Sequence, residues 1–282
     1  GSSLTTGIKN TMCGAYAGYT SLLVDSTVCV GYNAGGSGAM TAAADGTVAV
    51  GFSALAANTE GERNTAIGHL ALTYPTTGAD DNVAIGYQSM AGNWTTAANI
   101  QNVAIGNYAM DAVMTGANFN VAVGHNALSG LTSGDGNTAV GLSAGVAMTS
   151  ANYNTAIGYA SILDIVEGTR NTAVGYHAFG GSLDTTADAS NDNIFIGYYA
   201  GGGNWDTAAS NNNVGIGNLA MDAAMNAAGD NTAVGYATLS GLTTGDYNTA
   251  LGAWAGNDIA AGTGNTCIGQ GAGDLIANAD NN

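Results

Sequence analysis

The sequence is poor in charged residues, and it has almost no basic ones. Of 282 residues only three are lysine or arginine, against 20 aspartates and glutamates, and the formal net charge is −17. Nucleic acids and anionic membranes attract proteins through basic side chains, so we expect neither as a partner. Charged residues make up 8% of the chain, where about a quarter is usual. The net charge keeps this otherwise uncharged chain soluble.

Proline, cysteine and long apolar runs are also scarce. Pro75 is the only proline, and Cys13, Cys29 and Cys267 are the only cysteines. The cysteines stand at hydrophobic positions of a repeated motif, which favours small buried side chains over a disulfide framework. No stretch approaches the ~20 apolar residues of a membrane span, so no membrane insertion is expected.

A five-residue motif, Asn-Thr/Val-Ala-Val/Ile-Gly, occurs fifteen times between Asn10 and Gly269. Its glycines follow one another at intervals of 17 to 22 residues. A short fixed period is typical of a solenoid in which each repeat forms one turn, called a rung below. We predict an all-β fold, a parallel β-solenoid (β-roll) of about 15 rungs, as one continuous domain over residues 1–282. Six rungs are duplicated, since residues 81–158 align with residues 192–269 without a gap.

Within the motif the residues alternate with a period of two, which predicts a strand. Thr172 and Val174 point to one side, and Ala173 points to the other. Neither side is charged in any copy, and a strand that is apolar on both faces is expected to be shielded from water on both. One face lines the solenoid, and the other needs a cover from a second sheet or another chain. We infer a homo-oligomer. The apolar stretch after each motif glycine, such as residues 176–179, is interpreted as a second strand.

Asparagine opens 13 of the 15 motifs. Stacked in register, these side chains would form a buried ladder in which each amide bonds to the next. The predicted ladder residues are Asn64, Asn82, Asn102, Asn120, Asn137, Asn154, Asn171, Asn193, Asn213, Asn231, Asn248 and Asn265. The motif glycine is expected to mark a corner that needs positive φ or close backbone approach.

The rungs resemble repeats of two known kinds. Residues 171–179 and 231–239 look like the Asn-Thr-Ala-Val-Gly-Tyr-x-Ala-Leu repeats of many predicted phage tail fibres. The Ala-Val/Ile-Gly strands are also similar to the head repeats of trimeric autotransporter adhesins. The resemblance covers almost the whole chain and implies a left-handed β-roll wound into a homotrimer. The rungs, typically 17 residues, are longer than those of the adhesin family, and no coiled-coil stalk or membrane anchor is recognisable.

The search for chemistry predicts no enzyme, no cofactor and no metal site. His69 and His125 follow a motif glycine at a place otherwise held by residues such as Tyr32, which predicts a stacked aromatic row. No zinc-type Cys/His spacing is present. Acidic residues in the return loops are interpreted as solvated turn residues in preference to calcium ligands. They include Glu60, Glu62, Asp80, Asp81, Asp135 and Asp246.

Trp94 and Trp205 lie in 20-residue rungs and have two interpretations. An exposed tryptophan could stack on a sugar ring of a glycan or host-surface receptor. Packing over Met110 or Met221 of the neighbouring rung is the favoured alternative.

These observations favour a structural fibre, the shaft of a virion tail fibre or of a cell-surface adhesin or filament. Such a protein would be extracellular, with weak glycan or host-surface contact. The repeat runs close to both ends without a cap, so we expect a fragment of a longer fibre or copies that stack end to end into a filament. An ice-binding β-solenoid is the alternative, and a polysaccharide-degrading β-helix enzyme is the least favoured of the three.

Overall fold

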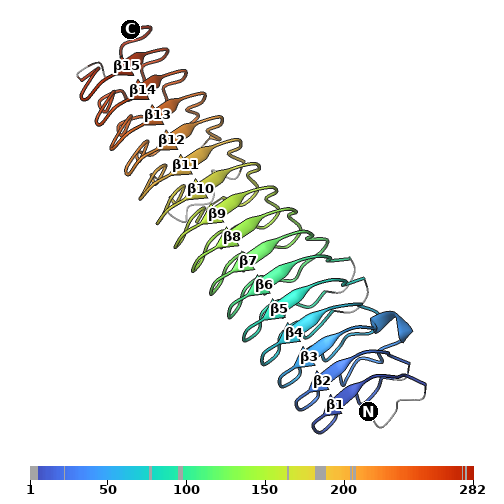
Figure 1. Ribbon diagram of the computed structural model, residues 1–282. Helices are drawn as coiled ribbons and strands as arrows, with labels where there is room; N and C mark the ends of the chain where they lie inside the picture. Colours follow the sequence, from blue (N-terminus) through green and yellow to red (C-terminus); the bar gives the residue numbers. More distant parts are fainter. Residues whose placement is uncertain are drawn as a thin grey trace. The chain divides into compact units, whose positions relative to one another are not determined.

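The residues that the structure describes form fifteen short strands, one in each motif copy (Figure 1). The computed structural model describes residues 6–21, 23–75, 78–94, 98–163, 165–181, 189–203, 205, 208–274, 276 and 278–282. The strands pair in parallel, so the predicted all-β parallel β-solenoid is confirmed. The left-handed winding and the trimeric state stay predictions.

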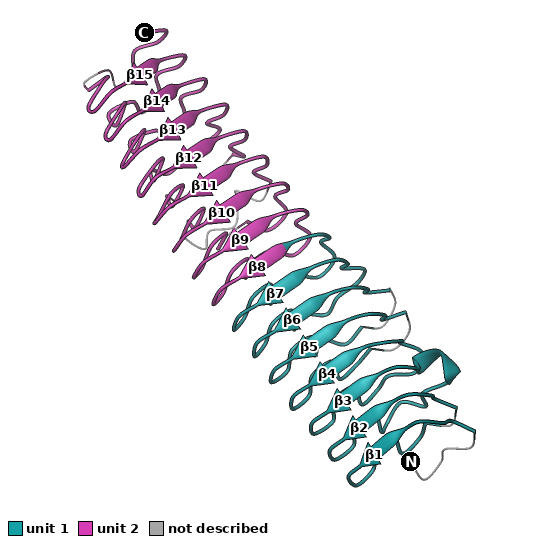
Figure 2. Ribbon diagram, in the orientation of Figure 1, with its two compact units in different colours: residues 1–137 teal, residues 138–282 magenta. Residues whose placement is uncertain are grey.

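The chain divides into two compact units, residues 1–137 and 138–282, called unit 1 and unit 2 (Figure 2). Unit 1 holds β1 (Thr11–Cys13), β2 (Val28–Val30), the 3₁₀ turn η1 (Ala42–Ala44), β3 (Val48–Val50), β4 (Thr65–Ile67), β5 (Val83–Ile85), β6 (Val103–Ile105) and β7 (Val121–Val123). Unit 2 holds β8 (Thr138–Val140), β9 (Thr155–Ile157), β10 (Thr172–Val174), β11 (Ile194–Ile196), β12 (Val214–Ile216), β13 (Thr232–Val234), β14 (Thr249–Leu251) and β15 (Thr266–Ile268).

Within each unit the strands stack in register, motif on motif. In unit 1, Ala84 of β5 lies beside Ala104 of β6. In unit 2, Ala156 of β9 lies beside Ala173 of β10. All four alanines are fully buried, whereas the residues on either side of Ala173 are only half-buried. The structure therefore assigns the interior to the alanine row, and the threonine and aliphatic rows face outward.

The segment after each motif glycine is a turn, so the prediction of a second strand is wrong. In residues 176–179, His177 and Phe179 have φ values of 49° and 51°. A strand needs negative φ throughout. The His177 N–H donates to the carbonyl of Tyr159 on one neighbouring rung at 3.0 Å, and the Phe179 N–H donates to that of Ala200 on the other at 2.8 Å. The turns therefore stack between rungs as strands would, which explains why their apolar pattern resembles one.

The motif glycine marks a corner where the backbones of neighbouring rungs meet. Gly106 has φ of 140°, a conformation that residues with a side chain rarely adopt. A Cβ atom at Gly106 would also overlap the backbone carbonyl of Gly124 on the next rung. Both requirements that the sequence predicts for this position, positive φ and close approach, are present.

The rung of β11 shows how the interior keeps its volume. Phe195 replaces the usual alanine and is fully buried. A Cβ at Gly201, in the turn of the same rung, or at Gly215, in β12, would lie 2.7 Å from the Phe195 ring. Two missing side chains thus make room for one large ring, as the dense packing of protein interiors requires.

Candidate functional site

Asparagine side chains at the start of the strands form a ladder of hydrogen bonds. In unit 1, the backbone N–H and the side-chain amide of Asn82 donate to Oδ1 of Asn64 at 2.9 and 3.2 Å. Asn102 makes the same two bonds to Oδ1 of Asn82 at 3.0 and 3.2 Å. Its side-chain amide also donates to the carbonyl of Ala117 in the return loop at 2.8 Å. Each amide therefore has partners for its oxygen and its nitrogen, which a buried polar group needs.

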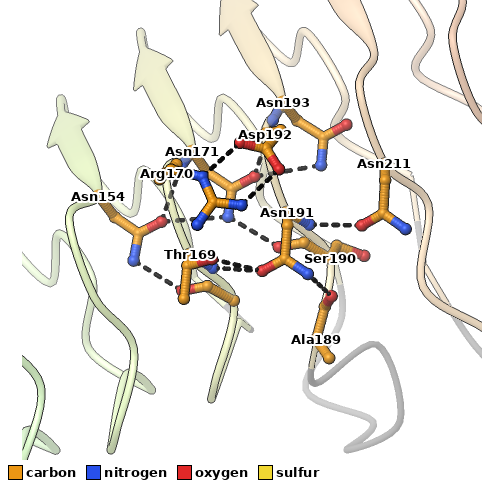
Figure 3. A network of polar contacts seen from close by, with 11 residues as sticks. Asn154, Thr169, Arg170, Asn171, Ala189, Ser190, Asn191, Asp192, Asn193 and Asn211 are labelled. Carbon is orange, nitrogen blue, oxygen red and sulfur yellow. Dashed lines mark hydrogen bonds and ion pairs between the residues drawn. The ribbon is translucent and has the colours of Figure 1, made fainter.

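The same ladder exists in unit 2, where Figure 3 shows three of its members. Asn171 donates from its backbone and its side chain to Oδ1 of Asn154 at 2.9 and 3.1 Å, across 17 residues. Asn193 does the same to Asn171 at 3.0 and 3.1 Å, across 22 residues. The geometry of the ladder is thus independent of the length of the rung.

The structure places every predicted ladder asparagine in a buried position directly before a strand. They are Asn64, Asn82, Asn102, Asn120, Asn137, Asn154, Asn171, Asn193, Asn213, Asn231, Asn248 and Asn265. Asn282 was not among them, yet its backbone and side chain donate to Oδ1 of Asn265 at 3.1 and 2.9 Å. Thr27 and Thr47 stand at the ladder position before β2 and β3 and are buried as well.

A second line of side chains lies two residues before the ladder position. The carboxylate of Asp135 accepts the backbone N–H of Asn118 on the neighbouring rung at 2.8 Å, and that of Asp246 accepts the backbone N–H of Gly229 at 2.7 Å. Six aspartates accept a backbone N–H in this way: Asp25, Asp45, Asp80, Asp135, Asp246 and Asp280. Asp80, Asp135 and Asp246 are thus half-buried loop residues that also join neighbouring rungs, a role that the interpretation as solvated turn residues does not include.

Two arginines join consecutive rungs at the exposed corner between these lines. The Arg63 guanidinium bonds to both carboxylate oxygens of Asp81 at 2.7 and 3.0 Å, and Arg170 bonds to those of Asp192 at 2.6 and 2.7 Å. These hydrogen bonds lower the pKa of each aspartate below its ordinary value. Arg63 also pairs with Glu62. Exposed ion pairs of this kind contribute little to stability. Their main effect is the lowered pKa of the two carboxyl groups.

Trp94 and Trp205 lie inside the chain, so the expectation of surface contact is corrected in favour of packing. Their exposed fractions are 2% and 5%. Trp205 packs against Phe179 and Phe195 with ring centroids 4.6 and 5.4 Å apart. Neither indole presents a face on which a sugar could stack.

The aliphatic row on the outward face of the strands is open to water in the single chain. Ile105 in unit 1 is 38% exposed, and Ile157 and Leu251 in unit 2 are 39% and 49% exposed. The alanine row is thus shielded inside the chain, as expected, and the expected cover of the aliphatic row by another chain stays a prediction. A repeated apolar surface of this kind is typical of an interaction site.

An aromatic row follows the motif glycines, beyond the corner. In unit 1, His69 stacks between Phe52 and Tyr87 with centroid distances of 4.9 and 5.3 Å. His125 meets the Tyr108 ring at 5.7 Å. Both histidines thus lie in the aromatic row, where the sequence places them.

The row continues in unit 2 with exposed tyrosines. Tyr176 stacks on Tyr159 at 5.1 Å and on Tyr198 at 5.4 Å. A second, inner pair, His177 and Tyr199, stacks at 5.1 Å. Burial lowers the pKa of His177, which favours its neutral form. The three outer tyrosines are each between 44% and 50% exposed.

Burial shifts the pKa values of several other titratable groups. Partial burial raises the pKa of Asp111 and of its duplicate Asp222. Burial also raises the pKa of the Cys29 thiol to about 11, so the thiol stays protonated and unreactive at neutral pH. In the part of the chain that the structure describes, no group of three or more His, Cys, Asp or Glu side chains could hold a metal ion.

Comparison with known proteins does not assign this chain to a family. No protein-family model matches the chain, and no curated protein has a similar sequence. The resemblance to tail-fibre and adhesin repeats therefore stays an expectation. Over the described ranges, no helix has the length and apolar character needed to cross a bilayer.

Proposed function

We propose that this chain is a structural fibre protein, the shaft of a virion tail fibre or of a cell-surface adhesin or filament. It works outside the cell as a homo-oligomer, with a trimer favoured. Surface contact with a glycan or a host receptor is its second, weaker task. The chain needs no enzymatic activity or cofactor for this role, and the described strands carry no carboxylate for polysaccharide cleavage.

The outward aliphatic row carries this proposal. It is uncharged, it repeats in register from β2 to β7 in unit 1 and from β8 to β15 in unit 2, and its members are more than a third exposed at positions such as Ile67, Ile105, Ile157 and Ile216. Burying such apolar surface away from water is favourable by about 25 cal/mol for each Å². In a cyclic trimer each copy would turn the same row toward the common axis, so that a second and a third copy cover it.

The direction of the ladder supports head-to-tail stacking as a further mode. In both units the later asparagine donates and the earlier one accepts, as in the pairs Asn82 with Asn64 and Asn171 with Asn154. A copy added in the same orientation continues this order of donors and acceptors. A copy added in the opposite orientation brings like groups together.

Native mass measurement and negative-stain imaging of the purified chain test the proposal. We expect the mass of a trimer. In the images, a discrete particle would indicate lateral association, and a filament would indicate end-to-end association. Ile157→Glu places a charge on the outward row and is expected to dissociate the oligomer, because burying an unpaired carboxylate is unfavourable.

Thr244→Glu is the matched control, since Thr244 lies in an exposed part of a return loop of the same unit. It adds the same charge and is expected to leave the oligomer intact. A wild-type chain that is monomeric at all concentrations, or an Ile157→Glu variant that assembles like wild type, would contradict the proposal.

One observation favours ice binding as a second candidate. In unit 2 the outward first position of the strand is threonine in β8, β9, β10, β13, β14 and β15. It is interrupted by Ile194 and Val214. Regular hydroxyl and methyl groups on a repeating face could order water. Measuring thermal hysteresis of the protein solution checks this. If there is none, the structural fibre remains as the single candidate function.

A further inference from the structure

Three tyrosines of the aromatic row in unit 2 occupy equivalent positions on consecutive rungs. Tyr159, Tyr176 and Tyr198 directly follow the motif glycines after β9, β10 and β11. The His177 N–H donates to the carbonyl of Tyr159, and the Tyr199 N–H donates to that of Tyr176, both at 3.0 Å. The backbone therefore holds the three tyrosines one rung apart. We call Tyr159, Tyr176 and Tyr198 the phenol stack.

The rings of the phenol stack are nearly parallel as well as close. The ring centroids of Tyr159 and Tyr176 are 5.1 Å apart with an interplanar angle of 9°, and those of Tyr176 and Tyr198 are 5.4 Å apart with an angle of 15°. Because the positions are equivalent and the rings almost parallel, matching atoms of two rings are about one strand spacing, ~5 Å, apart. The three side chains are between 44% and 50% exposed, so an oxidant reaches them from solvent.

Other tyrosine pairs lie as close but at steep angles. In unit 1 the rings of Tyr16 and Tyr32 have centroids 5.5 Å apart and an interplanar angle of 78°. In unit 2 the rings of Tyr198 and Tyr199 have centroids 4.7 Å apart and an angle of 61°. Ring orientation, and not distance, therefore distinguishes the phenol stack from these pairs.

Ring orientation matters for one reaction of phenols, the coupling of two phenoxyl radicals. In such a radical the unpaired electron occupies p orbitals perpendicular to the ring, including those of the two ortho carbons beside the carbon that bears oxygen. Parallel stacked rings point these orbitals at each other, whereas a steep angle points the edge of one ring at the face of the other. Alignment of reacting atoms before the reaction raises its rate strongly.

We propose that the phenol stack is an oxidative modification site at which two neighbouring rings are joined as dityrosine. The co-reactant is hydrogen peroxide acting through a haem peroxidase, which removes one electron at a time. Each of the two phenols gives up one electron and its hydroxyl proton. The two radicals form one carbon–carbon bond between ortho carbons, and each of these carbons then passes its hydrogen, as a proton through water, to the oxygen of its own ring. The pair has lost two hydrogen atoms, and one hydrogen peroxide has become two waters.

The new bond joins consecutive rungs covalently. Tyr159 and Tyr176 are 17 residues apart in the sequence, and Tyr176 and Tyr198 are 22 residues apart. A cross-link that closes such a loop restricts the unfolded chain and so opposes unfolding. The inference goes beyond the proposed function and does not depend on it, because both reacting rings belong to one chain.

Limited oxidation of the purified chain with a haem peroxidase and a small amount of hydrogen peroxide tests the proposal. Aspartates separate the three tyrosines in the sequence, so a protease that cleaves at aspartate places each on its own peptide. Mass spectrometry then detects linked peptide pairs that are two hydrogen atoms lighter than their sum. We expect the links within the phenol stack to exceed the link between Tyr16 and Tyr32 by at least about tenfold, because the rings of the latter pair are not parallel.

Three variants test the role of the stack. Tyr176→Phe keeps the central ring and removes its hydroxyl, so both links should disappear. Tyr247→Phe is the matched control, since Tyr247 is 64% exposed and lies outside the aromatic row, and it should leave both links unchanged. Leu142 holds the row position beside Tyr159, and its carbonyl accepts the Ala160 N–H at 2.9 Å. Leu142→Tyr should therefore add a link to Tyr159. Circular dichroism confirms that each variant folds.

The outcomes separate the modification from the assembly. Under denaturing conditions the linked protein should have the mass of one chain less two hydrogen atoms, and it should unfold at a higher urea concentration than the unlinked chain. Native mass is recorded on the same samples, so a monomer that forms the links counts only against the fibre. The site is overturned if Tyr16 and Tyr32 couple as readily as the stack, or if the linked tyrosines come from two chains. It is overturned equally if free tyrosine in the same solution couples and the chain does not, and an unchanged urea midpoint would overturn the stabilising role of the link.

Discussion

Oδ1 of Asn102 accepts two hydrogen bonds from Asn120, one from its backbone N–H at 2.9 Å and one from its side-chain amide at 3.1 Å. Both residues are fully buried. The backbone donor would otherwise point into an interior without water, so the side chain of one rung completes the hydrogen bonding of the next. Rungs are thus joined by side chains as well as by the sheet.

Asn102→Ala should therefore destabilise the chain strongly. It removes the acceptor for Asn120 and leaves a buried donor without a partner, which we expect to lower the free energy of unfolding by about 2–4 kcal/mol. Urea unfolding at a fixed protein concentration measures this. Gln101→Ala, at the exposed neighbouring position, should change it by less than about 0.5 kcal/mol. If the two substitutions changed the free energy of unfolding equally, the ladder would not be a source of stability.

Two glycines with positive φ should respond differently to alanine. At Gly106, with φ of 140°, the new Cβ overlaps a backbone carbonyl of the next rung, so Gly106→Ala should cost about 3–5 kcal/mol or prevent folding. At Gly46, with φ of 71°, the nearest atom is Cγ of Arg63 at 3.5 Å. Gly46→Ala should cost only about 1 kcal/mol. Thermal unfolding compares the two, and a tolerated Gly106→Ala would argue against close contact at the corner.

The Arg170–Asp192 pair should be visible in the titration of the carboxyl group. The pKa of Asp192 lies below its ordinary value of 3.8 because Arg170 bonds to the ionised form. The pair therefore contributes stability above pH 3.8, and this contribution is lost as pH falls through the lower folded-state pKa. Arg170→Gln should raise the pKa of Asp192, as followed by NMR. Arg63→Gln should instead raise the pKa of Asp81 and leave Asp192 as in wild type.

Asp222 should change the stability with pH in the opposite direction to Asp192. Burial raises its pKa above the ordinary 3.8, so its contribution to stability is present below that pH and is lost as pH rises through the folded-state value. Asp222→Asn keeps the side chain neutral, and we expect the variant to be more stable than wild type at neutral pH and equal to it in acid. Denaturant unfolding across the acid range checks this. Asp111→Asn should behave alike, and a pH-independent difference would exclude burial as the cause.

The strands and the ladder follow from local signals in the sequence. Alternation of Thr172, Ala173 and Val174 predicts a strand because side chains there have a period of two. The recurrence of asparagine before the strand predicts stacked amides because parallel rungs bring equal positions together. The choice of the alanine row as the interior required the structure, since both rows are uncharged.

Other features could not be predicted because their signals resemble something else. Turns such as residues 176–179 alternate between positive and negative φ, which also sends neighbouring side chains to opposite sides and imitates a strand. Asp135 looks like any aspartate in a polar loop, although Asp, Asn or Thr recurs two positions before the motif in most rungs. Trp205 packs inside against Phe179 and Phe195, and Gly201 and Gly215 leave space for the Phe195 ring, a compensation between rungs that no single motif reveals.

The equal bond lengths of the ladder across rungs of 17 and 22 residues have a practical consequence. The amides hold the registry between neighbouring repeats, and the return segments differ in length without changing it. Foreign peptides grafted into such segments should be displayed at regular intervals while the repeats keep their alignment. The chain thus has the properties of a modular scaffold, in which display sites are chosen by counting repeats.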